Sequence, residues 1–327
     1  MNALLTLFVG AAISATALTF LVRAGARRLG SAARPGDPRP LHPTPRVGGI
    51  AIALTWVGAI VAVGLWGDDS LRRALRSLPI VPILAASLVV FLVGLADDMR
   101  PLTPSVKITL ESLAAAALIG AGIVIHRVSM LGTTIDLSWL SVLVTLAWII
   151  GITNAFNLVD GLDGLATGLA IIAGVTCTAI VLIRGETATA VLLVALLGAL
   201  VGFLPFNFTR ASIFLGDSGS LFIGFVLALT AITGLQKGAT ALAMGVPILI
   251  FALPLLDAAS TIVRRLRGAP PAPEGRLRAA LTHLVQPDRE HIHHRLVSGG
   301  LSQTAAVLLL YGIAVCLAGL AFVLTER

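Results

Sequence analysis

Long apolar runs recur along this chain of 327 residues, and they restrict its possible folds more than any other feature. Each run has roughly 17 to 25 residues, the length that a helix needs to cross a hydrocarbon core. The strands of a membrane barrel are about ten residues long and alternate between apolar and polar residues. These runs are longer and show no such alternation. The sequence therefore predicts an all-α, polytopic integral membrane bundle of ten helices, with spans at about 3–23, 47–66, 79–96, 106–125, 138–153, 164–183, 187–205, 213–233, 239–263 and 304–324.

Basic residues indicate how this bundle is oriented. The first run is followed, not preceded, by its positive charges, so we interpret it as a spanning helix with the N-terminus outside and not as a signal peptide. The odd-numbered loops then hold 16 of the 23 Lys and Arg residues, and such residues favour the cytoplasmic side. Arg72, Arg73 and Arg76 in the second loop run against this bias. We predict a multi-pass protein of the inner (plasma) membrane.

Composition excludes an ordinary soluble protein, because only 12% of the residues are charged and the mean hydropathy is +0.98. No hydrophilic stretch is long enough for a separate domain, so residues 1–327 form a single predicted membrane domain with one long cytoplasmic loop, 264–303. The net charge of +7 lies mainly at the predicted inner surface, beside anionic lipids. We expect membrane lipids as partners and no nucleic acid. Cys177 and Cys316 lie in apolar runs and predict no disulfide.

Five polar motifs adjoin the odd-numbered loops, and on this topology all five lie at the cytoplasmic face. They are Pro45–Gly49, Asp97-Asp98, Asn154–Asp163, Phe214–Ser220 and His291–Arg295. Acidic side chains are costly to place within a bilayer and usually have a functional reason for being there. Their agreement in position predicts an active site at the cytoplasmic face.

The acidic motifs favour a site for phosphates and a divalent cation. One of Asp97 and Asp98 could meet a cation or a reacting phosphate while the other bonds backbone, since neighbours on a helix point in different directions. The amides and carboxylates of the third motif are the hard oxygen ligands that suit Mg²⁺. Asp217 precedes an apolar span, where a helix start favours anions. Solvated charge and ordinary helix capping are the alternatives for these residues.

The histidine motif contains His291, His293 and His294, followed by Arg295. A Zn²⁺ site would need further ligands at a recognised spacing, and the sequence offers no such cysteine pair or carboxylate. Arginine donates two parallel hydrogen bonds to phosphate, and histidine can change its charge near neutral pH. We therefore interpret this motif as a phosphate-binding loop.

Taken together and in this order, the five motifs resemble the polyprenyl-phosphate N-acetylhexosamine-1-phosphate transferases. The resemblance runs over about residues 45 to 300. The wider family includes the enzyme that uses UDP-N-acetylmuramoyl-pentapeptide, but the sequence His-Ile-His-His-Arg-Leu is more similar to the branch that uses UDP-N-acetylglucosamine (UDP-GlcNAc). That branch is often drawn with eleven spans, so eleven is the alternative to ten.

The resemblance implies a role for each matching residue. Asp217 and Asn157 would bind Mg²⁺, with Mn²⁺ as a substitute, and the catalytic pair Asp97-Asp98 would lie beside the acceptor phosphate. Lys107 would bind the lipid phosphate, and Phe214 would stack on the uracil ring. The remaining substrate-binding residues would be Asn154, Asp160, Asp163, His291, His293, His294 and Arg295.

The implied reaction transfers GlcNAc-1-phosphate from UDP-GlcNAc to undecaprenyl or another polyprenyl phosphate, releasing UMP at the start of lipid-linked cell-wall or surface glycan synthesis. The lipid phosphate is largely ionised near pH 7, so we expect catalysis by positioning and charge neutralisation. A two-step route through an aspartyl-phosphate is the alternative. Other UDP-sugar donors, a homodimer and, from a different class, a secondary transporter also remain open. A transporter would place its charges near the midplane.

Overall fold

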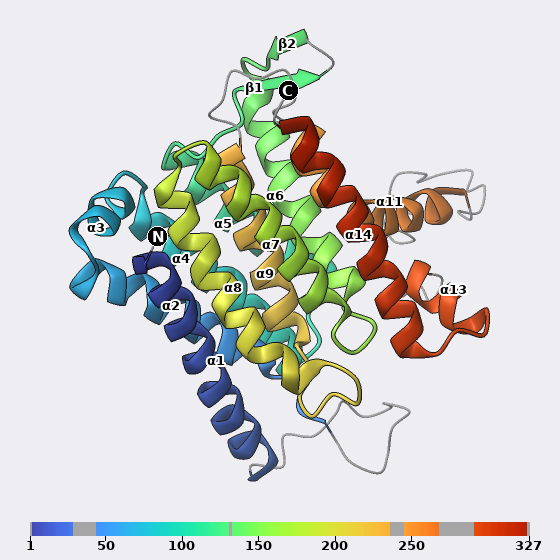
Figure 1. The fold of residues 1–327 in the computed structure, drawn as a ribbon. Helices are drawn as coiled ribbons and strands as arrows, with labels where there is room; N and C mark the ends of the chain where they lie inside the picture. Colours follow the sequence, from blue (N-terminus) through green and yellow to red (C-terminus); the bar gives the residue numbers. More distant parts are fainter. Residues whose placement is uncertain (1, 29–43, 131–132, 236–244, 268–290, 326–327) are drawn as a thin grey trace.

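The computed structural model describes residues 2–28, 44–130, 133–235, 245–267 and 291–325, and these fold into helices with one small hairpin (Figure 1). Most of the predicted loop (268–290) and the start of the predicted ninth span (239–244) lie outside the described residues. The elements are α1 Asn2–Arg28, α2 Gly48–Trp66, α3 Asp69–Leu75, α4 Ile80–Met99, α5 Pro104–Gly120, β1 Arg127–Met130, β2 Thr133–Asp136, α6 Leu140–Val159, α7 Leu165–Ile183, α8 Thr187–Asn207, α9 Gly216–Thr230, a π-helical turn Ala231–Leu235, α10 Gly245–Ile250, α11 Ala252–Arg267, α13 Ile292–Ser298 and α14 Gln303–Thr325.

The helices confirm an all-α polytopic membrane protein. Among the described residues, eight helices are long and apolar enough to cross a membrane: α1, α2, α4, α6, α7, α8, α9 with its π-helical turn, and α14. The other two predicted spans correspond to α5 and to α10 with α11. Helix α5 has 17 residues and carries Lys107 and Glu111. The ninth run is interrupted at Phe251 because Pro254 has no N–H to bond to the carbonyl of Ile250.

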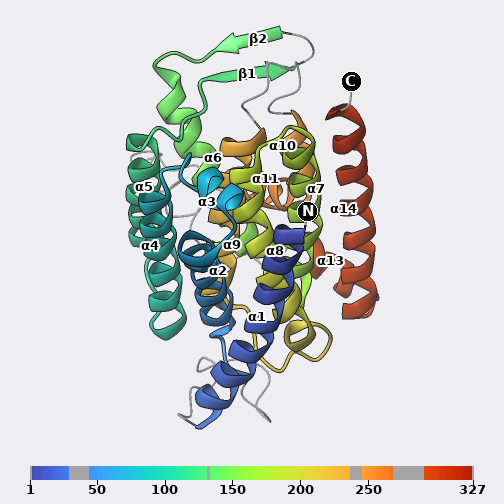
Figure 2. The same cartoon turned by 60° about the vertical axis from the view of Figure 1, so that its left-hand side comes forward.

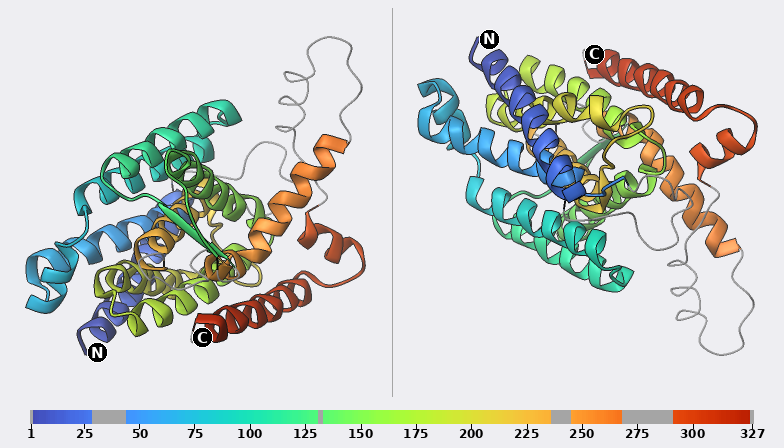
Figure 3. Two further views of the ribbon diagram at one scale, coloured as in Figure 1. Left: turned by 90° about the horizontal axis from the view of Figure 1, so that it is seen from above. Right: turned by 90° about the horizontal axis from the view of Figure 1, so that it is seen from below.

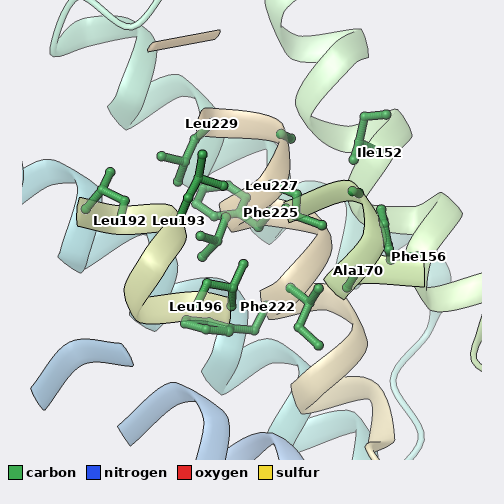
Figure 4. Close-up of a cluster of buried hydrophobic side chains, with 14 of the residues drawn as sticks. Ile152, Phe156, Ala170, Leu192, Leu193, Leu196, Phe222, Phe225, Leu227 and Leu229 are labelled. Carbon is green, nitrogen blue, oxygen red and sulfur yellow. The ribbon is translucent and has the colours of Figure 1, made fainter. Parts of the chain in front are cut away.

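Helix α9 is the centre of the bundle, and 94% of its spanning segment is buried. It packs against α2, α4, α6, α7 and α8, which surround it when the bundle is viewed along its axis (Figure 3). Phe222 and Phe225 of α9 are fully buried among side chains such as Leu196 of α8 and Phe156 of α6 (Figure 4). An apolar helix that is buried on all sides packs in the interior of a bundle.

Glycines allow α2 and α4 to approach the start of α9 closely. A Cβ atom on Gly49 would collide with the backbone of Gly219, and one on Gly94 would collide with the backbone of Asp217. Helices in membranes associate mainly by such close packing, because the lipid is as apolar as the side chains. The close packing fixes the end of α4 against the start of α9, where two of the acidic motifs lie.

The β1–β2 hairpin and α11 both extend beyond the packed helices (Figures 1 and 2). The β1–β2 hairpin projects beyond the helices at the end where α6 begins (Figure 2), and its strands of four residues are too short to be predicted from alternation. Helix α11 runs outward from the bundle, across the direction of its neighbours (Figures 1 and 3). It brings the chain to the region where α13 and α14 begin.

Candidate active site

The first and fourth motifs are held together by backbone hydrogen bonds. Phe214 donates its N–H to the carbonyl of Pro45 at 2.9 Å, and Gly48 donates to the carbonyl of Phe214 at 3.0 Å. Gly49 donates to the carbonyl of Leu215, also at 3.0 Å. These bonds join the start of α2 to the segment before α9. Residues about 170 positions apart in the sequence thus form one wall of the site.

Asp98 caps the start of α9 from the neighbouring helix α4. Its Oδ1 accepts a hydrogen bond from the N–H of Asp217 and its Oδ2 accepts one from the N–H of Ser218, each at 2.9 Å. The first N–H groups of a helix have no partner within the helix, and a carboxylate satisfies them well. Asp98 therefore fixes the backbone position of Asp217.

Asp97 turns toward a cation instead. The ammonium group of Lys107 lies 3.3 Å from Oδ2 of Asp97 and 2.7 Å from Oδ2 of Asp217. The N–H of Leu102 donates to Oδ1 of Asp97 at 2.6 Å. Only 8% of the Asp97 side chain and 13% of the Lys107 side chain are exposed, so the charges are weakly screened. Lys107 links α4, α5 and α9 at the centre of the acidic motifs.

A cavity of about 110 Å³ opens beside this network. The guanidinium of Arg46 lies 5.8 Å from the centroid of the Phe214 ring, within the range of a cation–π contact. Both residues border the cavity together with carboxylates and amides of the third and fourth motifs. The full lining is Arg46, Asn157, Asp160, Gly161, Leu162, Asp163, Asn207, Phe214, Leu215, Gly216 and Asp217.

Three residues of the third motif have distinct surroundings. Asn157 donates to the hydroxyl of Ser220 on α9 at 2.9 Å. Asp163 accepts from the N–H of Ala211 at 3.0 Å and so holds the loop between α8 and α9. The pKa of the Asp160 carboxyl is raised well above its usual value, because burial disfavours its charge and the carboxylates of Asp217 and Asp98 repel it.

The site has an excess of negative charge that a divalent cation would balance. Within the described ranges, the carboxylates of Asp97, Asp98 and Asp217 lie beside the cations Lys107 and Arg46, and Asp163 borders a neighbouring pocket with Arg210. The Asp160 carboxyl adds to the negative charge when it is ionised. No three side chains among His, Cys, Asp and Glu converge as a complete metal site in the described part of the chain. Mg²⁺ commonly uses one or two carboxylates and completes its shell with water and substrate phosphates. Asp217 and Asn157, which border the same cavity, fit such an incomplete ligand set.

The histidine motif begins α13 and is anchored to α11. Asp257 of α11 is 1% exposed, and it accepts hydrogen bonds from Nδ1 of His291 at 3.0 Å and from the N–H of Ile292 at 2.8 Å. The rings of His291 and His293 are parallel, with centroids 5.5 Å apart. A carboxylate bonded in this way fixes the tautomer and orientation of an imidazole.

His293 connects the histidine motif to the acidic loop after α6. Its ring packs against Gly161, where a Cβ atom would collide with Nε2. Burial, followed by the neighbouring His294, lowers the pKa of the His293 imidazole to about 4, so this ring is neutral near pH 7. His294 and Arg295 are exposed. The described structure therefore brings one edge of the histidine motif against the third motif.

Comparison with known proteins decides the family. Residues 80–235 match the model described as glycosyl transferase family 4. A probable undecaprenyl-phosphate N-acetylglucosaminyl 1-phosphate transferase of Bacillus subtilis is 31% identical, over 93% of this chain and 80% of the relative. The chain belongs to glycosyl transferase family 4. A decaprenyl-phosphate N-acetylglucosaminephosphotransferase of Mycobacterium tuberculosis is 36% identical, over 89% of this chain and 74% of the relative. A phospho-N-acetylmuramoyl-pentapeptide-transferase of Latilactobacillus sakei is 33% identical, over 58% of this chain and 61% of the relative.

In this family 4 glycosyl transferase, the structure brings most of the predicted site residues together around one cavity and the start of α9. Asn157, Asp160, Asp163, Phe214 and Asp217 border one cavity. Asp97, Asp98 and Lys107 surround Asp217. His293 packs against Gly161 in the loop after α6, and His291 is bonded to Asp257 of α11. Asn154 lies one turn before Asn157 on α6, is not among the residues that line the cavity, and donates to Glu111 of α5. The predicted roles of these residues stay predictions.

Sequence reasoning missed three residues of this glycosyl transferase that contact the predicted ones. Arg46 was part of a motif but had no assigned role. Asp257 and Glu111 were counted inside apolar runs, and each is 1% exposed. An ionisable residue within a spanning run is by default a candidate functional residue, and that signal would have identified both.

Proposed function

We propose that this chain transfers N-acetylglucosamine-1-phosphate from UDP-GlcNAc to undecaprenyl phosphate or another polyprenyl phosphate. The products would be polyprenyl-diphosphate-GlcNAc and UMP. The names of the relatives that cover most of the chain support this choice of donor and acceptor. A UDP-N-acetylmuramoyl-pentapeptide donor is the alternative, and relatives with that name match a smaller part of the chain.

The observation that carries the proposal is the largely buried ammonium of Lys107, which lies between Asp97 and Asp217. A cation at this position can exchange a carboxylate partner for the phosphate of an incoming lipid. Helix α5 lies at the edge of the bundle (Figure 2), where a lipid tail would remain in the membrane while its phosphate reaches Lys107. Charge-assisted contacts of this kind position a phosphate for attack and neutralise its charge.

The other residues would bind the donor. Phe214 and Arg46 border the cavity with the flat and cationic surfaces that suit a uracil ring and a phosphate. Asp217 and Asn157 would hold Mg²⁺, which when bound neutralises the charge of the diphosphate and the departing UMP. Asp98 keeps the Asp217 backbone in place, and the histidine motif would cover the sugar end. A lipid phosphate oxygen would then attack the β-phosphorus in a direct displacement.

An assay of the purified protein in detergent tests the donor and acceptor. We expect UMP release with UDP-GlcNAc and undecaprenyl phosphate, and loss of that release when EDTA removes divalent cations. The donors tested for comparison with UDP-GlcNAc are UDP-glucose, UDP-N-acetylgalactosamine and UDP-N-acetylmuramoyl-pentapeptide. Turnover with the pentapeptide donor alone would select the alternative reaction. Folded protein that turns over none of these donors would contradict the proposed function.

Isotope exchange separates the direct displacement from the two-step route. Labelled UMP should exchange into UDP-GlcNAc only when the lipid phosphate or the lipid product is present, because direct displacement leaves no sugar-phosphate on the enzyme. Exchange with rigorously delipidated enzyme would instead indicate a covalent intermediate and a two-step reaction.

The orientation of the bundle is part of this proposal, with the acidic motifs facing the cytoplasm. Ser298 of α13 and Ser70 of α3 are exposed and can each be replaced by the similarly sized cysteine in a Cys316→Ala background. In intact cells, a membrane-impermeant thiol reagent should label Ser70→Cys and should label Ser298→Cys only after the cells are opened. The reverse pattern would place the site on the outer face.

A further inference from the structure

Glu111 is a carboxylate buried in the membrane bundle without an assigned role. It lies on α5 one turn after Lys107, so both side chains project from the same side of the helix. The residue is 1% exposed. Its Oε2 accepts a hydrogen bond of 2.5 Å from Nδ2 of Asn154 on α6, while its Oε1 is buried without a hydrogen-bond partner. A buried acid in such a position is costly to retain unless it serves a purpose.

The contact with Glu111 fixes the orientation of the Asn154 amide. Nδ2 of Asn154 donates to Oε2 of Glu111 and also to the carbonyl of Ile150, at 3.0 Å. The Ile150 carbonyl can only accept hydrogen bonds, and a carboxylate is likewise an acceptor, so the NH₂ group must face both. The carbonyl oxygen, Oδ1, is then the polar atom of Asn154 that can serve the reaction.

We propose that Glu111 is a positioning residue, which orients the Asn154 amide so that Oδ1 is left as a fixed oxygen acceptor on the turn of α6 that precedes Asn157. This inference rests on the proposed function, because it concerns the same reaction site. The ligand class that such an oxygen suits is a cation or an N–H or O–H donor. Glu111 acts through Asn154 and needs no contact with the substrate.

Three variants test this role through kcat and KM for UDP-GlcNAc and for undecaprenyl phosphate. Glu111→Leu should lower kcat about 10- to 100-fold, the usual effect of losing a partner that orients a functional group. Glu111→Gln should stay within about threefold of the unsubstituted enzyme, because its amide oxygen still accepts from Asn154. The variant Asn154→Ala combined with Glu111→Leu should be no slower than Asn154→Ala alone, since interacting residues are not additive.

Thr145→Val is the matched control. Thr145 lies on the same helix as Asn154 and is fully buried, and its hydroxyl accepts from the N–H of Ile125 at 2.9 Å. It lies nine residues, roughly 14 Å, nearer the start of α6. This control removes a buried hydrogen-bond acceptor that lies far from the site. It should therefore lower thermal stability and leave kcat unchanged.

Several results would overturn the role of Glu111. Glu111→Gln as slow as Glu111→Leu would show that the charge is required and not the acceptor. Losses that multiply in the double variant would show that Glu111 does not act through Asn154, and a fully active Glu111→Leu would show no role at all. If Glu111→Leu does not fold, Asn154→Asp replaces it. That change sets two carboxylates against each other, and adding Glu111→Gln should restore part of the activity, whereas no recovery would count against the contact.

The proposed function can fail separately from this inference. An unsubstituted enzyme that is inactive with every UDP-sugar would contradict the transferase reaction. Normal activity of the unsubstituted enzyme, together with any of the contrary results for Glu111, would contradict the inference alone.

Discussion

Replacing Asp217 by asparagine should lower turnover about 100- to 1,000-fold, the loss expected when one charge-stabilising group is removed from an active site. The Asp217 carboxylate borders the cavity and contacts Lys107 at 2.7 Å. The amide keeps the size of the side chain but removes the anionic oxygen that Mg²⁺ prefers. The measurement is turnover of UDP-GlcNAc over a series of Mg²⁺ concentrations.

Asp69→Asn is the matched control for this prediction. Asp69 also lies in the first turn of a helix, α3, and pairs with a cation, Arg72. Its side chain is 74% exposed, and exposed ion pairs contribute little. The control should therefore keep normal turnover. Near-normal turnover of Asp217→Asn at saturating Mg²⁺ would remove Asp217 from the proposed metal site.

Lys107→Met should nearly abolish activity and also destabilise the protein. Without the ammonium group, the buried carboxylate of Asp97 and the partly buried carboxylate of Asp217 lose the cation between them. Breaking a buried pair by removing one partner costs about 3 to 5 kcal/mol, because a charge is left uncompensated. We expect turnover to fall about 100-fold or more, with a lower unfolding temperature in detergent, measured on the same sample.

Arg127→Met removes a cation from a different ion pair for comparison. The side chain of Arg127 is 72% exposed and lies 3.6 Å from Asp136 in the hairpin, so its loss should change neither turnover nor stability measurably. Lys107→Arg keeps the charge and should restore much of the stability. Substantial activity in a folded Lys107→Met variant would contradict the proposed binding of the lipid phosphate.

The sequence by itself determined the class of the fold, and it identified the acidic motifs that the structure brings together at the start of α9. Apolar runs of spanning length require helices, because backbone N–H and C=O groups have no other partners in lipid. The prediction placed elements such as α7 at 164–183, where the helix is Leu165–Ile183. Acidic motifs at helix ends were identifiable because charges are rare in such a chain. Less predictable were the break at Phe251 and the short hairpin, which depend on one proline and on strands of four residues.

Tertiary structure alone decided which partner each motif residue binds. Asp97 and Asp98 are adjacent and chemically identical, yet Asp97 binds Lys107 while Asp98 caps α9. The difference arises because packing of α4 against α9 places one carboxylate beside backbone N–H groups that lie 119 and 120 positions later in the chain. Glu111 and Asp257 gain their partners in the same way, from helices or loops distant in sequence. Apolar patterns fix where helices lie along the chain, but close packing between helices fixes which polar atoms meet.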